Sequence, residues 1–166
     1  MIHELYRALI VDEKRNQMIV EDVVKAVNEG RIPVVLTERR EHLEKLRSLL
    51  SSRVKNIFVM KGGMGKKQRK TLSEEMKAVD DERVILATGR YLGEGFDDPR
   101  LDTLFLTLPV SWKGTVAQYA GRLHRLYDMK TEVIIYDYAD LNVPMLAKMY
   151  GRRVSGYKAI GYEINE

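Results

Sequence analysis

The sequence predicts an α/β domain with a mainly parallel central sheet and helices on both faces. First, it contains five short runs of β-branched and other apolar residues, at 34–37, 57–60, 84–88, 103–106 and 133–136. Second, these runs are nearly continuous and do not alternate with polar residues, as expected of strands that are buried on both faces. Third, helical stretches separate most of them, and this alternation is typical of a parallel sheet between helical layers.

Two helices are expected ahead of the first strand, over residues 2–10 and 12–29, and the second should end at Gly30. Apolar residues at helical spacing predict two helices between later strands. One stripe consists of Leu43, Leu46, Leu49 and Leu50, and the other of Val116, Ala120, Leu123 and Tyr127. A further helix is expected from Lys66 to about Val79.

After the last strand, Asn142 is expected to cap a helix that begins near Pro144, and residues 151–166 are expected to form a loop and a short extended tail. A chain of 166 residues has the size of one ordinary domain. The expected parts are N-terminal helices, a core, and a terminal helix with a tail, at residues 1–30, 31–140 and 141–166.

Composition excludes several classes of protein and site. Hydrophobic residues make up 45% of the chain and charged residues 31%, which fits neither a disordered nor a membrane protein. No run approaches the roughly 18 apolar residues that a membrane span requires, so we expect a cytoplasmic protein without a membrane partner. The absence of cysteine removes thiolate chemistry, and the three histidines show no metal-ligand spacing. The net charge of +4 permits a polyanionic partner.

The helix expected at 115–125 carries a polar face. Gln118, Arg122 and Arg125 are spaced by four and then three residues, which places them on one side of the helix. The apolar residues Val116, Ala120 and Leu123 occupy the opposite side. Two guanidinium groups one turn apart can bind one anion, and Gly121, which costs about 1 kcal/mol relative to alanine, suits close approach of a backbone or ligand. Spacing alone also allows a merely solvated basic face.

A glycine-rich loop follows the third strand, over residues 87–99. It contains Gly89, Gly93 and Gly95. Glycine permits close backbone approach, and Pro99 favours an extended conformation at Asp98. Backbone N–H groups in such a loop can meet phosphate or sugar oxygens. A surface turn rich in glycine is the alternative when the loop is considered by itself.

In order along the chain, these two segments resemble the fifth and sixth motifs of superfamily 2 helicases. The matching residues are Ala87-Thr88, Glu94-Gly95-x-Asp97 and Gln118-x-x-Gly121-Arg122-x-x-Arg125. Val34 to Arg39 resembles the fourth motif, and Gly62-Gly63 followed by Arg69 resembles the glycine and arginine after the next strand of this family. The resemblance covers roughly residues 12–140 and follows the second lobe of DEAD/DEAH-type helicases. It implies a RecA-like three-layer fold.

The resemblance also implies a role for each matched residue in binding ATP between two lobes. Arg122 and Arg125 are expected to reach the γ-phosphate. Asp97 is expected to meet the ribose, Gly95 lies beside it, and Gln118 is expected to help hold the cleft. The chain is thus expected to be part of a nucleic-acid-dependent ATPase and to be inactive alone.

The remaining ATP-binding groups are expected on an N-terminal RecA-like lobe of the same parent protein. Residues 62–67 approximate a phosphate-binding loop but depart from its sequence pattern at two positions. Lys67 stands where a serine or threonine would ligate Mg²⁺, and Met60 stands where the first glycine belongs. The resemblance implies that the phosphate cradle and the Mg²⁺ ligands come from the other lobe.

A basic block is expected to contact DNA or RNA backbone. Lys66, Lys67, Arg69 and Lys70 lie at the start of a predicted helix, where cations oppose the positive end of the helix dipole. An arriving phosphate would relieve that repulsion, and such contacts read no base sequence. The full set of expected contacts is Thr37, Arg39, Gly63, Lys66, Lys67, Arg69, Thr88, Gly89 and Arg90. A solvated lysine face is the alternative.

Two other functions compete with a motor lobe. One is a nucleic-acid-binding module without motor activity, which the same basic block would serve. The other is a dinucleotide-binding oxidoreductase, because Gly63-Met64-Gly65 follows a strand and opens a helix. Gln68 occupies the third glycine position of that fingerprint, which weakens this second reading.

Overall fold

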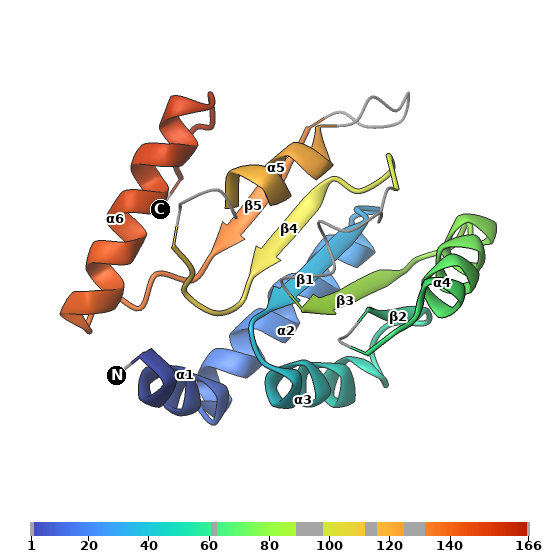
Figure 1. Cartoon of the computed structure of the whole chain (residues 1–166), viewed down its shortest axis with the longest axis horizontal. Coiled ribbons are helices and arrows are strands. Elements are labelled where there is room, and N and C mark those ends of the chain that lie inside the picture. Colours follow the sequence, from blue (N-terminus) through green and yellow to red (C-terminus); the bar gives the residue numbers. More distant parts are fainter. Residues whose placement is uncertain (1, 61–62, 89–97, 112–115, 125–131, 166) are drawn as a thin grey trace.

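The computed structural model describes residues 2–60, 63–88, 98–111, 116–124 and 132–165 (Figure 1). Its elements alternate between helices and strands after two initial helices. They are α1 (Ile2–Ile10), α2 (Glu13–Asn28), β1 (Pro33–Thr37), α3 (Arg40–Leu50), β2 (Ile57–Met60), α4 (Lys66–Ala78), β3 (Val84–Thr88), β4 (Thr103–Leu106), α5 (Ala117–Leu123), β5 (Ile134–Asp137) and α6 (Pro144–Ala159).

The five strands form one sheet in the order β2-β3-β1-β4-β5, and every neighbouring pair is parallel. Side chains alternate between the two faces of each strand. Val35 and Phe105 pack with residues of α2 and α3, whereas Val34 and Leu104 pack with residues of α4 and α5 on the other face. Helix α6 lies alongside the edge strand β5 (Figure 1). The predicted three-layer α/β architecture is confirmed.

The sequence located most elements to within one residue at each end. This holds for the five strands and for α1, α2 and α4. Gly30 follows the end of α2 with φ of +82°, in the left-handed region that glycine adopts without strain. The stripe in α5 is confirmed as far as Leu123, while Tyr127 lies outside the described residues.

Two expectations about the C-terminal region were wrong. Asn142 does not cap the last helix; Val143 occupies the N-cap position, with no side-chain cap hydrogen bond. Residues 151–159 do not form a loop, because α6 continues to Ala159, and of the described residues only 160–165 follow the helix as a tail. The physical reason is tertiary contact: Arg153 and Tyr157 are buried on the inner side of α6, which outweighs the low helix propensity of its glycines.

The N-cap of α2 gives a test of local stability. Asp12 has an extended backbone conformation, and its side chain accepts a hydrogen bond from the N–H of Arg15 at 3.1 Å. Asp12→Ala is expected to lower the free energy of unfolding by about 1 kcal/mol, and Asp12→Asn by clearly less because it keeps an acceptor. Urea unfolding of both variants measures this, and equal losses would show that the cap contributes nothing.

Candidate functional site

The parallel sheet brings the carboxyl ends of its strands to one edge. Thr37 at the end of β1 pairs in register with Thr88 at the end of β3, and Met60 of β2 pairs with Ala87. On the other side of β1, Leu36 pairs with Leu106 of β4. The segments that follow these strands therefore start side by side, at the edge where open α/β sheets bind ligands. These segments contain most of the residues that the sequence singled out.

A buried hydrogen-bond chain lies behind this edge. The hydroxyl of Thr37 donates to Nδ1 of His42 at 2.9 Å, and Nε2 of His42 donates to Oδ1 of Asn16 at 2.8 Å. Nδ2 of Asn16 in turn donates to the carbonyl oxygen of Ile10 at 2.8 Å. Thr37 is only 2% exposed, so its hydroxyl faces this chain and not the surface. Burial is the main cause that lowers the pKa of His42 to about 4, so the imidazole is neutral at pH 7.

Arg39 lies at the surface of the same edge and is held against α1. Its guanidinium carbon is 5.1 Å from the ring centre of Tyr6, and its Nη2 contacts Nδ1 of His3. The neighbouring Glu38 is partly buried, and that burial raises the pKa of its carboxyl group. Arg39 thus presents a partly exposed cation beside the end of β1.

Gly63 brings the segment after β2 close to the same place. Its φ is +89°, and a Cβ built on it would lie 3.6 Å from Nη2 of Arg40. A side chain at position 63 would be strained by the backbone conformation and not by lack of space. Gly63 and Arg40, which lie far apart in the sequence, are therefore near neighbours, and Arg40 directly follows Arg39.

Helix α4 has cations at both ends. At its C-terminal end, the carbonyl oxygen of Met76 accepts from Nη1 of Arg83 at 3.0 Å and from Nη2 of Arg100 at 2.9 Å, which suits the negative end of the helix dipole. At the other end, the first turn has no acidic residue, and Lys66 and Lys67 are exposed. The N-terminal end of α4 thus combines exposed cations with the positive end of the dipole.

Helix α5 places its polar face outward. Gln118 is exposed, whereas Val116, Ala120 and Leu123 are buried. A Cβ at Gly121 would have no heavy atom within 4 Å, so no neighbouring part of the described chain requires glycine there. The backbone of Arg122 belongs to the helix, on the side of Gln118.

Several predicted site residues fall outside what the structure describes. These are Gly89, Arg90, Gly95, Asp97 and Arg125, together with the side chain of Arg122. Their roles remain predictions from the sequence. Among the described predicted residues, the structure brings Thr37, Arg39, Gly63 and Thr88 to one edge and places Lys66 and Lys67 on the helix that follows β2.

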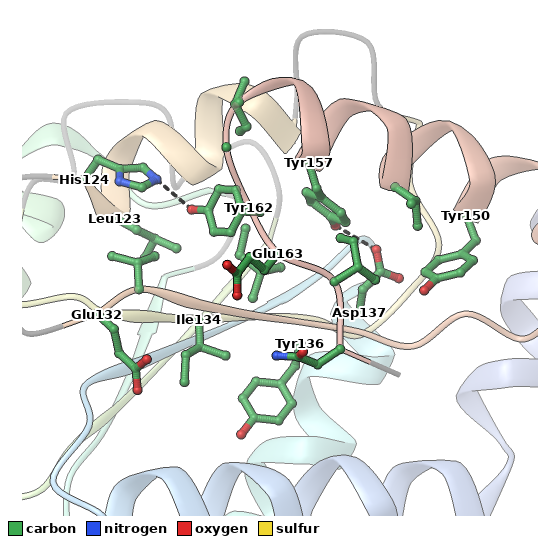
Figure 2. Close-up of a pocket in the computed structure, with 17 residues that line it drawn as sticks. Leu123, His124, Glu132, Ile134, Tyr136, Asp137, Tyr150, Tyr157, Tyr162 and Glu163 are labelled. Atoms are coloured by element: carbon green, nitrogen blue, oxygen red, sulfur yellow. Dashed lines mark hydrogen bonds between the residues drawn. The ribbon is translucent and has the colours of Figure 1, made fainter.

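A pocket of about 900 Å³ lies away from this edge, between β5, α6 and the C-terminal residues 160–165 (Figure 2). His124 and Tyr162 are hydrogen-bonded beside it, with Nε2 and Oη 2.7 Å apart. In the part of the chain that the structure describes, no three acidic, histidine or cysteine side chains are grouped to hold a metal ion. No helix there has the length and apolar character to span a membrane.

Two buried arginines that fix the fold were not among the predicted site residues. Arg15 of α2 is 5% exposed and Arg153 of α6 is 1% exposed, and each forms an ion pair with an aspartate that follows or ends β5. The available signal was their spacing, because each lies four residues before a buried apolar residue, Ile19 and Tyr157 respectively, and so belongs to the inner face of its helix.

A family model described as helicase conserved C-terminal domain matches residues 6–127. Among curated proteins, transcript termination protein A18 of fowlpox virus is 27% identical over 151 residues, 87% of this chain and 31% of that protein. Transcript termination protein OPG145 of monkeypox virus is 28% identical over 159 residues, 89% of this chain and 30% of that protein. The chain spans about a third of the length of these relatives.

Solved structures confirm the RecA-like fold. T4 UvsW has a TM-score of 0.77 at 18% identity, covering 96% of this chain and 35% of that one. The E. coli DEAD-box protein SrmB, solved with the regulator of ribonuclease activity A, has a TM-score of 0.65 at 19% identity, covering 83% of this chain and 79% of that one. Domain 2 of Mss116p, bound to an RNA duplex, has a TM-score of 0.56 at 17% identity, covering 74% of this chain and 48% of that one.

The neutral, buried His42 predicts a loss of stability in mild acid. An unfolded chain takes up the proton near pH 6.5, whereas the folded chain resists it down to about pH 4. The contribution of neutral His42 to the free energy of unfolding is therefore fully present above pH 6.5. It is lost as the pH falls, and the loss reaches about 3 kcal/mol near pH 4. Urea unfolding of the wild type and His42→Gln at pH 7 and pH 4.5 measures it. An equally steep fall in the variant would contradict the assignment.

Proposed function

The chain belongs to the family of helicase conserved C-terminal domains and is the second lobe of a superfamily 2 helicase, and we propose that it completes an ATP-driven motor acting on DNA or RNA. The observation that carries this proposal is that α5 buries its apolar side and leaves the opposite side open at Gln118. Gln118 is exposed there, and Arg122 follows one turn later on the same side. ATP and Mg²⁺ would be held mainly by a first lobe.

The proposed role of Arg122 and Arg125 is to stabilise charge on the γ-phosphate. Guanidinium groups offer several N–H donors in a fixed plane, which suits phosphate oxygens. Arginines contributed across a domain boundary act only when the lobes close, so hydrolysis follows closure. Asp97 and Gly95 would contact the ribose side of the nucleotide, and Gln118 would help to hold the closed cleft. The chain alone would be catalytically silent.

The proposed nucleic-acid surface is the carboxyl edge of β1, β2 and β3 with the start of α4. Exposed Lys66 and Lys67 at the positive end of a helix dipole favour an anion, and Arg39 and Gly63 lie at the same edge. Arg69, Thr88, Gly89 and Arg90 belong to the proposed surface as well. Thr37 is buried, so it would act by fixing the turn that carries Arg39.

The names of similar proteins support a nucleic-acid substrate. The poxvirus relatives are transcript termination proteins, and the Mss116p domain was solved on an RNA duplex. We therefore propose that this chain contacts the backbone of RNA or DNA, and that the first lobe supplies the rest of the nucleic-acid-binding surface.

The arginine assignment is tested in a protein that contains both lobes. Arg125→Ala is expected to lower kcat for nucleic-acid-stimulated ATP hydrolysis by about 10³-fold, because an arginine at the γ-phosphate acts mainly in the transition state. Arg47→Ala, which removes an exposed arginine from α3, is the control and should retain the wild-type rate. Hydrolysis by Arg125→Ala at the wild-type rate would refute the role.

The backbone-binding surface is tested by charge reversal at the two ends of α4. Lys66→Glu with Lys67→Glu is expected to weaken nucleic-acid binding at every sequence and to reduce the slope of log affinity against log salt by about 1.5 to 2. Lys77→Glu changes an exposed lysine in the last turn of the same helix and is the control. Equal effects of the double variant and the control would indicate only a general charge effect.

A further inference from the structure

The segment at 107–110, which leads from β4 toward α5, is held by helices from both ends of the chain. Arg15 of α2 donates from Nη1 to the carbonyl oxygen of Thr107 at 2.5 Å. The hydroxyl of Tyr6 in α1 donates to the carbonyl oxygen of Pro109. Backbone carbonyls in a connection between elements ordinarily face water, so side-chain donors aimed at them fix the path of this segment.

Arg153 of α6 supplies a third donor to the same segment. Its Nη1 donates to the carbonyl oxygen of Val110 at 2.9 Å, while Nε and Nη2 bind the two carboxylate oxygens of Asp137 at 2.7 and 2.8 Å. The hydroxyl of Tyr157 also donates to Asp137, at 2.7 Å. This guanidinium, 1% exposed, links α6 to the end of β5 and to the path into α5. Its planar group makes both interactions at once, which a lysine ammonium cannot reproduce.

The C-terminal end of α5 is contacted by the segment after α6. His124 is the residue directly after the helix, and its Nε2 lies 2.7 Å from the hydroxyl oxygen of Tyr162. The two rings meet edge to face, with centres 5.5 Å apart. Figure 2 shows Tyr162 lying between His124 and Tyr157, so the segment after α6 reaches the end of α5 across the pocket.

The contacts of Arg153 and Tyr162 come from a part of the chain without an assigned role, since the family match ends at residue 127. We propose that α6 and the segment after it form a brace that holds α5 in place, Arg153 through the segment 107–110 ahead of α5 and Tyr162 through His124 directly after it, and so sets the position of the arginines proposed to contact the nucleotide. The inference rests on the proposed function of Arg122 and Arg125. Arg153 and Tyr162 are positioning residues, because neither would touch ATP.

A positioning role has a kinetic signature. Displacing a catalytic group by about 1 Å can cost on the order of 100-fold in rate, whereas ground-state binding by other groups is retained. Loss of the brace should therefore lower kcat more than it raises KM for ATP. A merely structural role would lower activity only in step with the fraction of protein folded.

Matched controls exist at the opposite end of the sheet and on its other face. Arg31 has a side chain 12% exposed and donates from Nη2 to the carbonyl oxygens of Asp102 and Glu132, at 3.0 and 3.2 Å, near the amino ends of β4 and β5. The hydroxyl of Tyr138 donates to Asp22 of α2 at 2.8 Å. Arg31→Lys and Tyr138→Phe thus remove the same kinds of interaction without touching α5.

The first experiment measures ATP hydrolysis in the two-lobe protein. Arg153→Lys is expected to lower kcat about tenfold or more with KM for ATP changed less than about threefold, and Tyr162→Phe to lower kcat about threefold. Arg31→Lys and Tyr138→Phe should keep kcat within about twofold of the wild type, with losses of melting temperature similar to those of the brace variants. If Arg31→Lys lowers kcat as much as Arg153→Lys, the brace is refuted.

The second experiment needs no activity and uses the 166-residue chain itself. Amide hydrogen exchange in α5 (117–123) is expected to accelerate in Arg153→Lys by about tenfold relative to exchange in α4, and to stay unchanged in Arg31→Lys. Unchanged exchange in α5 of Arg153→Lys would overturn the brace. If the two-lobe wild type fails to hydrolyse ATP while exchange follows the expected pattern, the proposed function fails and the brace stands.

Discussion

The parallel pairing of the strands is the constraint on which the rest of the molecule depends. Pairing of β1 with β3 and β4 in register brings the ends of these strands to one edge, although they lie tens of residues apart in the sequence. Parallel strands also require coverage on both faces, which α2 and α3 supply on one side and α4 and α5 on the other. Thr37 and Thr88 lie at two of these strand ends, and Arg39 and Gly63 follow closely after the ends of β1 and β2.

Positive charge in this chain occurs in two different settings. Arg15 and Arg153 are almost fully buried and paired with aspartates, so they satisfy backbone carbonyls inside the protein and are closed to ligands. Lys66 and Lys67 are exposed at the start of α4, where the helix dipole opposes them. Burial and pairing thus separate the cations that hold the fold from those that suit a phosphate backbone, although the net charge is only +4.

Local signals in the sequence were sufficient for the sheet and for most helices, because strands buried on both faces appear as continuous apolar runs. They placed the start of α6 at Pro144 but failed beyond residue 150, where glycines suggested a loop and the decisive contact was the one between Arg153 and Asp137, which is distant in sequence. They also could not show that Thr37 turns its hydroxyl inward to His42. Motif order predicted which residues follow each strand end, whereas side-chain direction depended on neighbours that only the fold brings together.

We propose that Arg122 of α5 and Arg125 after it reach a nucleotide held by another lobe. The most direct test is a structure of the two-lobe protein with Mg²⁺-ADP and a planar phosphate mimic. A guanidinium nitrogen of Arg122 or Arg125 is expected within about 3 Å of an oxygen or fluorine of the mimic, as charge-assisted hydrogen bonds require. Both guanidinium groups bound instead to carboxylates of their own lobe, with the mimic in place, would contradict it.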